Sequence, residues 1–274
     1  MHRFNIVTSS WDDGHPQDLR IADLLRSRRL NGTFYIPINA PCGRELLRDS
    51  DLRSINSEGF EIGAHTVSHK ILPRLPAREL DYEVQACKQI LEQNLGQEVV
   101  TFCYPNGRYN SETLRSVEKA GYLGARTTRM LSVRTKFPPF EMSTTLQAYP
   151  HPTLAYLRNQ GRAKSISGFT KYLTTLSRCR TWVDLGKRLF DEVLEHGGVW
   201  HIYGHSWEIE KLNIWDDLTE ILDYIAHRQG VTYATNAHLL SLLKRTDGLI
   251  PATAPLEQGS LGYQDKENQT PCHR

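Results

Sequence analysis

The sequence predicts an α/β protein built around a parallel sheet of about seven strands. The main reason is that short β-type runs alternate along the chain with amphipathic helical patterns, as they do in βαβ units. Length and composition agree with this fold class. A chain of 274 residues can form one large domain or two small ones, and 39% hydrophobic and 23% charged residues are the usual balance of a globular protein.

Seven runs rich in apolar and β-branched residues predict the strands. In chain order they cover residues 4–10, 33–38, 60–64, 99–104, 122–126, 199–205 and 231–235. Parallel neighbours need long crossover connections, so helices are expected between most of them.

Helical patterns fill the spaces between these runs, and a glycine stop follows each of them except the last. In the clearest pattern Leu80, Val84, Cys87 and Leu91 recur at three- and four-residue spacing, and Pro76 suits the first turn. The predicted helices cover residues 18–29, 76–95, 111–120, 181–196, 215–229 and 236–245.

Two segments depart from this rhythm. Residues 127–180 carry Pro138-Pro139 and Pro150-His151-Pro152 without a sustained period, which indicates an elaborated connection rather than a domain. Residues 246–274 have three prolines and no apolar period, so a disordered tail is predicted. The catalytic domain is therefore expected to span residues 1–245.

Composition also excludes several classes of partner. A net charge of only +2, from 33 Lys and Arg against 31 Asp and Glu, argues against nucleic acid. No apolar run approaches the roughly 18 residues of a membrane span. Asp12 and Asp13 interrupt the N-terminus before a secretory signal core is complete, and five cysteines without a C-x-x-C pair form no disulfide framework. A cytoplasmic protein is predicted, with no signal for its oligomeric state.

Polar side chains follow four of the predicted strands where each strand ends. Because parallel strands place their carboxyl ends on one rim, these side chains are expected to meet there. The four segments are Trp11 to Gly14, His65 to His69, Tyr104 to Gly107 and Gly204 to Glu208.

His65 and His69 are spaced for chelation, since residues four apart on a helical turn project from one face. A carboxylate from Asp12 or Asp13 would complete a two-histidine, one-aspartate site for zinc or another divalent transition metal. Neighbouring side chains diverge on an extended chain, so one aspartate can ligate while the other faces a substrate. The alternative is two histidines bonded to nearby carbonyls and an aspartate turn.

Taken together, these segments resemble the motifs of the polysaccharide deacetylase family (NodB-like, carbohydrate esterase family 4). Ser10 to Gly14 is similar to the family's T-F-D-D-G, and His65 to His69 matches H-[ST]-x-x-H in full. Asn31 to Pro37 is similar to the family's second strand. The resemblance implies a distorted (β/α) barrel, usually with seven strands, that hydrolyses N-acetyl groups with one divalent metal.

The resemblance also implies a role for each motif residue. Asp12 would be the catalytic base, and Asp13, His65 and His69 would ligate the metal, with zinc expected and cobalt or nickel as alternatives. The late strand ending at His205 resembles the fifth motif, which makes His205 the general acid.

The family's third motif, R-P-P-Y, falls on Cys103, Tyr104, Pro105 and Asn106, so the arginine that usually supports the base is missing. Asn106 stands where a backbone N–H helps to bind the oxyanion. Tyr104 and Trp207 are expected to bind substrate, although Trp207 could instead cover the barrel rim.

The expected function is removal of an N-acetyl or related acyl group from an amino sugar or oligosaccharide. One alternative is a cytosolic amidase that acts on a small cyclic amide or ureide. Another is a catalytically silent carbohydrate-binding protein, which the missing arginine at Cys103 favours.

Overall fold

A computed structural model describes residues 4–162 and 179–246 of the chain. Within these residues eight strands form one sheet, and every pairing in it is parallel, which confirms the α/β class. The strands are β1 (Asn5–Asp12), β2 (Thr33–Ile36), β3 (Glu61–Ala64), β4 (Thr101–Cys103), β5 (Gly124–Arg126), β6 (Leu146–Gln147), β7 (Gly198–Gly204) and β8 (Thr232–Tyr233). Only β6 was not predicted, because two residues are too short to show a period.

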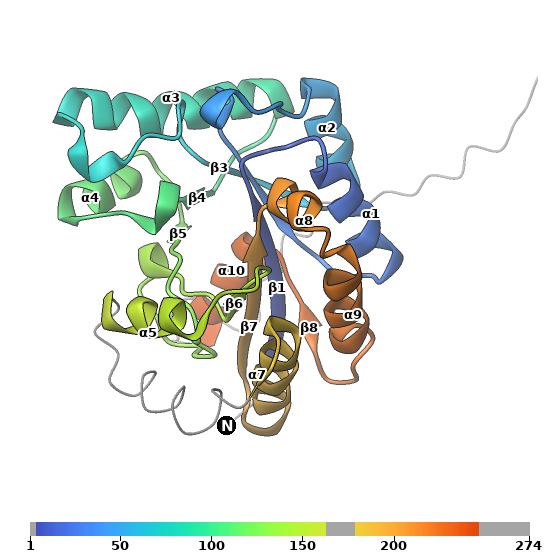
Figure 1. Cartoon of the computed structure of the whole chain (residues 1–274). Coiled ribbons are helices and arrows are strands. Elements are labelled where there is room, and N and C mark those ends of the chain that lie inside the picture. The colour runs from blue at the N-terminus through green and yellow to red at the C-terminus, as the bar shows by residue number, and fades with distance from the viewer. Residues whose placement is uncertain (1–3, 163–178, 247–274) are drawn as a thin grey trace, which may run out of the picture.

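The sheet curls into the distorted (β/α) barrel that the sequence predicts. Its strand order is β5-β4-β3-β2-β1-β7-β6, and β8 pairs with the start of β1. Between the outer strands β5 and β6, the N–H of Met142 donates to the carbonyl of Ala125 (2.9 Å) and its own carbonyl accepts from Thr127 (2.8 Å). In Figure 1, β1 and β7 lie side by side at the centre of the molecule.

Helices surround the sheet (Figure 1). Three of them were not predicted: α2 and α8 bury only two side chains each, and α5 lies in the proline-interrupted connection. Such short or weakly apolar segments give little helical period. The described helices are α1 (Asp18–Ser27), α2 (Asp49–Ser57), α3 (Ala77–Leu95), α4 (Ser111–Lys119), α5 (Thr153–Arg162), α7 (Trp182–His196), α8 (Ser206–Leu212), α9 (Trp215–Ile225) and α10 (Asn236–Thr246).

The alternation of β1 divides its side chains between two environments. Val7 and Trp11 join the apolar core between sheet and helices. Thr8, Ser10 and Asp12 lie on the other face of the strand and are buried among polar partners. Since successive side chains alternate across a strand, this register places Asp12 at the carboxyl end of β1, on the polar face.

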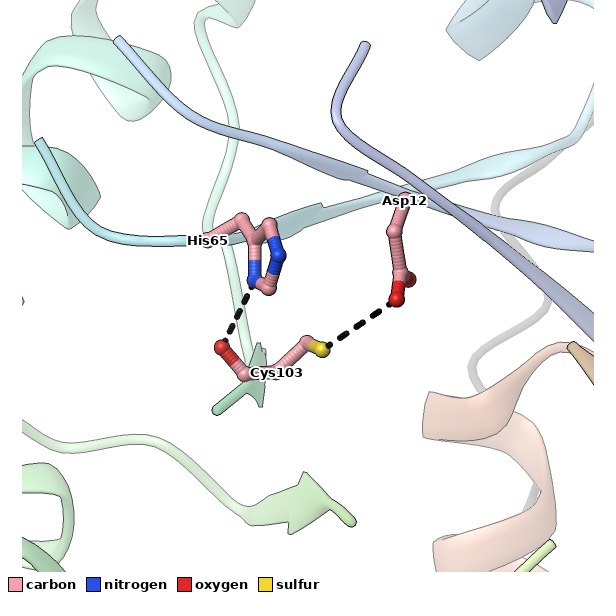
Figure 2. Close-up of side chains that lie close together, drawn as sticks. All are labelled: Asp12, His65 and Cys103. Atoms are coloured by element: carbon pink, nitrogen blue, oxygen red, sulfur yellow. Dashed lines mark hydrogen bonds between the residues drawn. The ribbon is translucent and has the colours of Figure 1, made fainter. Parts of the chain in front are cut away.

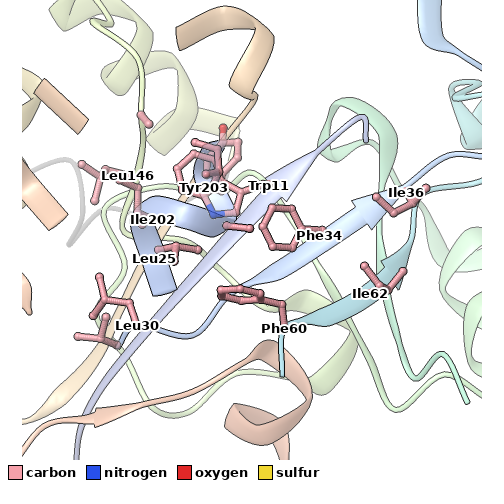
Figure 3. Close-up of a cluster of buried hydrophobic side chains, with 14 of the residues drawn as sticks. Trp11, Leu25, Leu30, Phe34, Ile36, Phe60, Ile62, Leu146, Ile202 and Tyr203 are labelled. Carbon is pink, nitrogen blue, oxygen red and sulfur yellow. The ribbon is translucent and has the colours of Figure 1, made fainter. Parts of the chain in front are cut away.

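The apolar core fixes that register. Trp11 is fully buried, and Figure 3 shows it in one cluster with Leu25 of α1, Phe34 of β2 and Ile202 of β7. A slip of β1 by one residue would move Trp11 to the polar face and Asp12 into the apolar core. The core therefore determines where Asp12 stands.

Two remaining predictions concern membranes and the C-terminal tail. None of the helices in residues 4–162 and 179–246 has the length and apolar character needed to cross a bilayer. The tail predicted at residues 246–274 lies outside the described residues, apart from Thr246 at the end of α10.

Candidate active site

The four strand-end segments meet at one rim of the barrel, as predicted. They border a cavity of about 750 Å³. Of the predicted site residues, seven line it: Asp12, Asp13, His65, His69, Asn106, His205 and Trp207.

Tyr104 is the exception, and its predicted contact with substrate is wrong. Its side chain is fully buried, and its hydroxyl donates to the backbone carbonyl of Phe140 at 3.2 Å. The ring stacks on Tyr109, with 4.9 Å between centroids. Tyr104 therefore anchors the start of the turn that contains Asn106. Asn106 itself has a left-handed backbone conformation with φ 55°.

His65 and His69 do converge, but not on the helical turn expected from their spacing. The strand β3 ends at Ala64, and Thr66 and His69 have left-handed backbones with φ values of 70° and 54°. The hydroxyl of Thr66 accepts from the N–H of His69 at 2.9 Å, which closes the turn. The two imidazole rings then lie 4.8 Å apart at 71°.

The hydrogen bond of His65 sets its tautomer. Nδ1 lies 2.8 Å from the carbonyl of Cys103, which can only accept, so Nδ1 carries the proton and Nε2 offers a lone pair. Burial lowers the pKa of His65 to about 4 despite nearby carboxylates, so the ring is neutral at physiological pH. A neutral imidazole fixed in this way is suited to metal ligation.

Asp13 completes a group of three donors with these histidines. Its Oδ1 lies 3.3 Å from Nε2 of His69 and 3.8 Å from Nε2 of His65. This Oδ1 is buried and has no hydrogen-bond partner. An unpartnered buried carboxylate oxygen that faces two imidazole nitrogens fits a divalent transition metal, which prefers this donor set.

The other oxygen of Asp13 is held by two donors. Oδ2 accepts from Nη2 of Arg44 at 3.1 Å and from Nε1 of Trp207 at 2.9 Å. The Arg44 guanidinium also lies over the Trp207 ring, 4.1 Å from its centroid. These contacts leave Oδ1 as the oxygen directed at the histidines. They also cover one face of Trp207 with an arginine.

A second group of candidate ligands, Asp12, His65 and Cys103, shares His65 with the first, and Figure 2 shows its three side chains. It is poorly suited to a cation. Burial raises the pKa of the Cys103 thiol well above its usual value, and the carboxylate of Asp12 is already paired with Arg126. The Asp13, His65 and His69 group is therefore the better candidate metal site.

Arg126 supplies the support for Asp12 that the motif lacks at Cys103. One guanidinium nitrogen, Nη2, donates to both carboxylate oxygens of Asp12, and both side chains are buried. Arg126 ends β5 and is the register partner of Cys103 on β4. The arginine thus stands one strand away from the position where the family motif places it.

The electrostatics of Asp12 follow from this pair. Burial raises the pKa of Asp12, but the attraction of Arg126, with smaller effects of His65 and His205, outweighs it and lowers the pKa to about 2. Asp12 is therefore ionised at physiological pH and able to accept a proton. Arg126 was not predicted as a site residue. An arginine that closes an apolar strand run was a signal that it lies at the rim, but not that it pairs with Asp12.

His205 faces Asp12 from the end of β7. Its Nε2 lies 3.8 Å from Oδ2 of Asp12, and its Nδ1 lies 2.6 Å from Oε2 of Glu208 in the first turn of α8. Burial lowers the pKa of His205, but Glu208 and Asp12 outweigh it and raise the pKa above 6.5. His205 can thus carry a proton on the nitrogen that faces the cavity.

Another histidine on β7, His201, has a structural role. It is buried, with Nε2 2.9 Å from the hydroxyl of Ser10. Burial lowers its pKa to about 3, so the ring is neutral.

The Trp207 contact leads to a prediction about metal affinity. Trp207→Phe removes the donor to Asp13 and keeps most of the ring, so zinc should bind about 10- to 100-fold more weakly. The matched control is Trp182→Phe, because Nε1 of Trp182 also donates to an aspartate, Asp217, at 3.2 Å but away from this cavity. Competition with a chromophoric chelator measures both affinities. Equal dissociation constants in the two variants would contradict the role given to Trp207.

Comparisons with known proteins find similar sequences and similar folds. Residues 2–125 match the family described as polysaccharide deacetylase. Two relatives are each 27% identical: the YxkH protein of Bacillus subtilis, over 44% of this chain and 44% of that protein, and the peptidoglycan-N-acetylglucosamine deacetylase of Bacillus cereus, over 43% and 54%. The chain thus covers about half the length of these relatives or less.

Solved structures extend the likeness over most of the chain. The Xyl-CE4 domain of a xylanase from a Trinervitermes trinervoides hindgut metagenome has a TM-score of 0.55 at 15% identity, covering 90% of this chain and 93% of that one. A family 4 carbohydrate esterase of Streptomyces lividans has a TM-score of 0.53 at 16% identity, covering 85% and 93%. The chain shares this fold, and its residues 2–125 are similar to the polysaccharide deacetylase family (NodB-like, carbohydrate esterase family 4).

Proposed function

We propose that the chain is a metal-dependent hydrolase that removes an N-acetyl group from an amino sugar within an oligosaccharide or polysaccharide. The observation that carries the proposal is the pairing of two sites at one rim. The donor group of Asp13, His65 and His69 lies beside Asp12 and His205, an ionised carboxylate and a histidine with a raised pKa. The likeness of residues 2–125 to the polysaccharide deacetylase family and the named activity of the Bacillus cereus relative support the same class of reaction.

The metal would be held by Oδ1 of Asp13 and the Nε2 atoms of His65 and His69. When bound, a divalent cation supplies Lewis acidity, which polarises the substrate carbonyl and makes a neighbouring water more acidic. Zinc suits this donor set, and cobalt or nickel could replace it.

The chain's own residues would then move the protons. Asp12, which Arg126 keeps ionised, accepts the proton of the attacking water as the C–O bond forms. Negative charge gathers on the former carbonyl oxygen, and a backbone N–H at the Asn106 turn would stabilise it. As the C–N bond breaks, Nε2 of His205 donates its proton to the leaving amine.

A substrate panel tests the proposal. Zinc-loaded protein is incubated with an N-acetylglucosamine oligomer, an acetylated xylan and a cyclic ureide, and acetate or ring opening is measured. The wild type is expected to release acetate from the oligomer. His69→Ala is expected to lose both the bound zinc and this activity. His196→Ala, an exposed histidine on α7, is the control. Ring opening of the ureide alone would favour the small-amidase alternative, and no turnover would favour the silent carbohydrate-binding protein.

The general-acid role of His205 leads to a separate prediction. His205→Ala should keep its metal and lose about 10²- to 10⁴-fold in kcat/KM on an acetamide, because an amine departs only when protonated. The loss on an activated aryl acetate should be much smaller, since a phenolate departs without a proton. Matched kcat/KM values for the two substrates measure the difference. Equal losses on both would remove the general-acid assignment.

A further inference from the structure

A chain of hydrogen bonds continues from His205 into the wall of the barrel. Glu208 Oε2, which accepts from His205, also accepts from Nε2 of Gln147 on β6 at 3.1 Å. The amide oxygen of Gln147 accepts in turn from the hydroxyl of Tyr203 on β7 at 2.8 Å. Nε2 of His151 lies 2.9 Å from the same oxygen. Four segments of the chain thus meet at one amide group.

These partners allow the Gln147 amide only one orientation. A carboxylate such as Glu208 can only accept, so the NH₂ group must face it. The amide oxygen then faces two donors, the Tyr203 hydroxyl and a protonated Nε2 of His151. A flipped amide would place its oxygen against the Glu208 carboxylate and its NH₂ against the two donors. The orientation is therefore fixed from three sides.

We propose that Gln147 is a positioning residue for the catalytic acid, acting through Glu208. Its amide NH₂ donates to Oε2 of Glu208 and holds this oxygen at the position where it accepts from His205. The Glu208 carboxylate thereby occupies Nδ1–H of His205 and leaves Nε2–H for the leaving amine. This inference rests on the proposed function of His205. It adds Gln147 as the residue that positions Glu208, the hydrogen-bond partner of His205.

Other charges around His205 do not replace this contact. Asp12 ends β1 and Asp13 follows it, but Asp12 is paired with Arg126, and Oδ1 of Asp13 is directed at the metal-site histidines. Asp18 at the start of α1 is fully buried, and burial raises its pKa well above the usual value, so it adds little negative charge. Glu208 is thus the anion that supports a protonated His205 directly, at 2.6 Å.

The test uses Gln147→Met, which keeps the length of the side chain and removes both hydrogen-bonding groups. Oε2 of Glu208 is then no longer held against Nδ1 of His205, so the pKa of His205 should fall by about 0.5 to 1 unit. The acid must be protonated, so the alkaline limb of the pH profile for amide hydrolysis should move to lower pH by the same amount. On the alkaline limb the kcat/KM for the amide should fall about 3- to 10-fold, and that for an aryl acetate much less.

Tyr203→Phe is the matched control, because it removes one hydrogen bond from the same amide and leaves the bond to Glu208. It should shift the alkaline limb by less than half as much. Titration of His205 by NMR in the zinc-loaded protein gives the same pKa without turnover. An unchanged His205 pKa in folded Gln147→Met would overturn the proposal. If the wild type hydrolyses no amide and the His205 pKa still falls in Gln147→Met, the network stands and the proposed function fails.

Discussion

Arg126→Met is expected to lower the free energy of unfolding by about 3–5 kcal/mol, because it leaves the buried carboxylate of Asp12 without a partner. It should also reduce turnover, since Asp12 loses the group that fixes it. Urea denaturation with and without zinc measures the first effect, and kcat/KM the second.

The chain offers a matched control three residues away. Arg129 is paired with Glu141 at 2.6 Å, but its side chain is 40% exposed, so Arg129→Met should change stability by about 1 kcal/mol or less. Adding Asp12→Asn to Arg126→Met should recover much of the lost stability, because a neutral amide needs no counter-charge. Equal effects of Arg126→Met and Arg129→Met would contradict the account.

The same pair gives stability a pH dependence with a defined sign. The pKa of Asp12 is about 2 in the folded protein against an ordinary value of 3.8, so its contribution is present above 3.8 and is lost as pH falls toward 2. The stability difference between wild type and Arg126→Met should therefore narrow over that interval. The narrowing should begin above pH 3.8, because burial without Arg126 raises the pKa of Asp12 in the folded variant.

Asp12→Asn is expected to lose about 10²- to 10⁴-fold in kcat/KM on the amide substrate. An amide of the same shape cannot accept the proton of the attacking water. Metal content should not change, since Asp12 is paired with Arg126 and the donors lie on Asp13, His65 and His69.

Asp13→Asn separates the two neighbouring aspartates. It should lose most of its zinc, because Oδ1 of Asp13 is the oxygen directed at both histidines. Metal content is measured by elemental analysis beside kcat/KM for each variant. Loss of zinc in Asp12→Asn, or full retention in Asp13→Asn, would overturn the division between base and ligand.

The sequence predicts local parts of this site well. Seven of the eight described strands were expected, and strand ends indicated Asp12, Asp13 and His205. The convergence of His65 and His69 was also predicted, but through a helical turn. Left-handed backbones at Thr66 and His69 produce it instead, and a four-residue spacing cannot distinguish the two conformations.

Partners from distant segments were the part that sequence could not predict. Arg126 lies 114 positions from Asp12 along the chain, and nothing in a strand pattern specifies which strands become neighbours across the barrel. Gln147 belongs to a two-residue strand without a period of its own. The prediction for Tyr104 was wrong for a related reason. Its place in the motif does not reveal that its hydroxyl donates to the backbone carbonyl of Phe140, 36 residues later in the chain.

A zinc titration of acetate release tests the central claim most directly. Protein stripped of metal is given increasing zinc, and acetate from an N-acetylglucosamine oligomer is measured at each ratio. The account predicts no release without metal and a rise that levels off at about one zinc per chain, the capacity of the Asp13, His65 and His69 site. Full activity in the stripped protein, or no acetate at any zinc ratio, would contradict it.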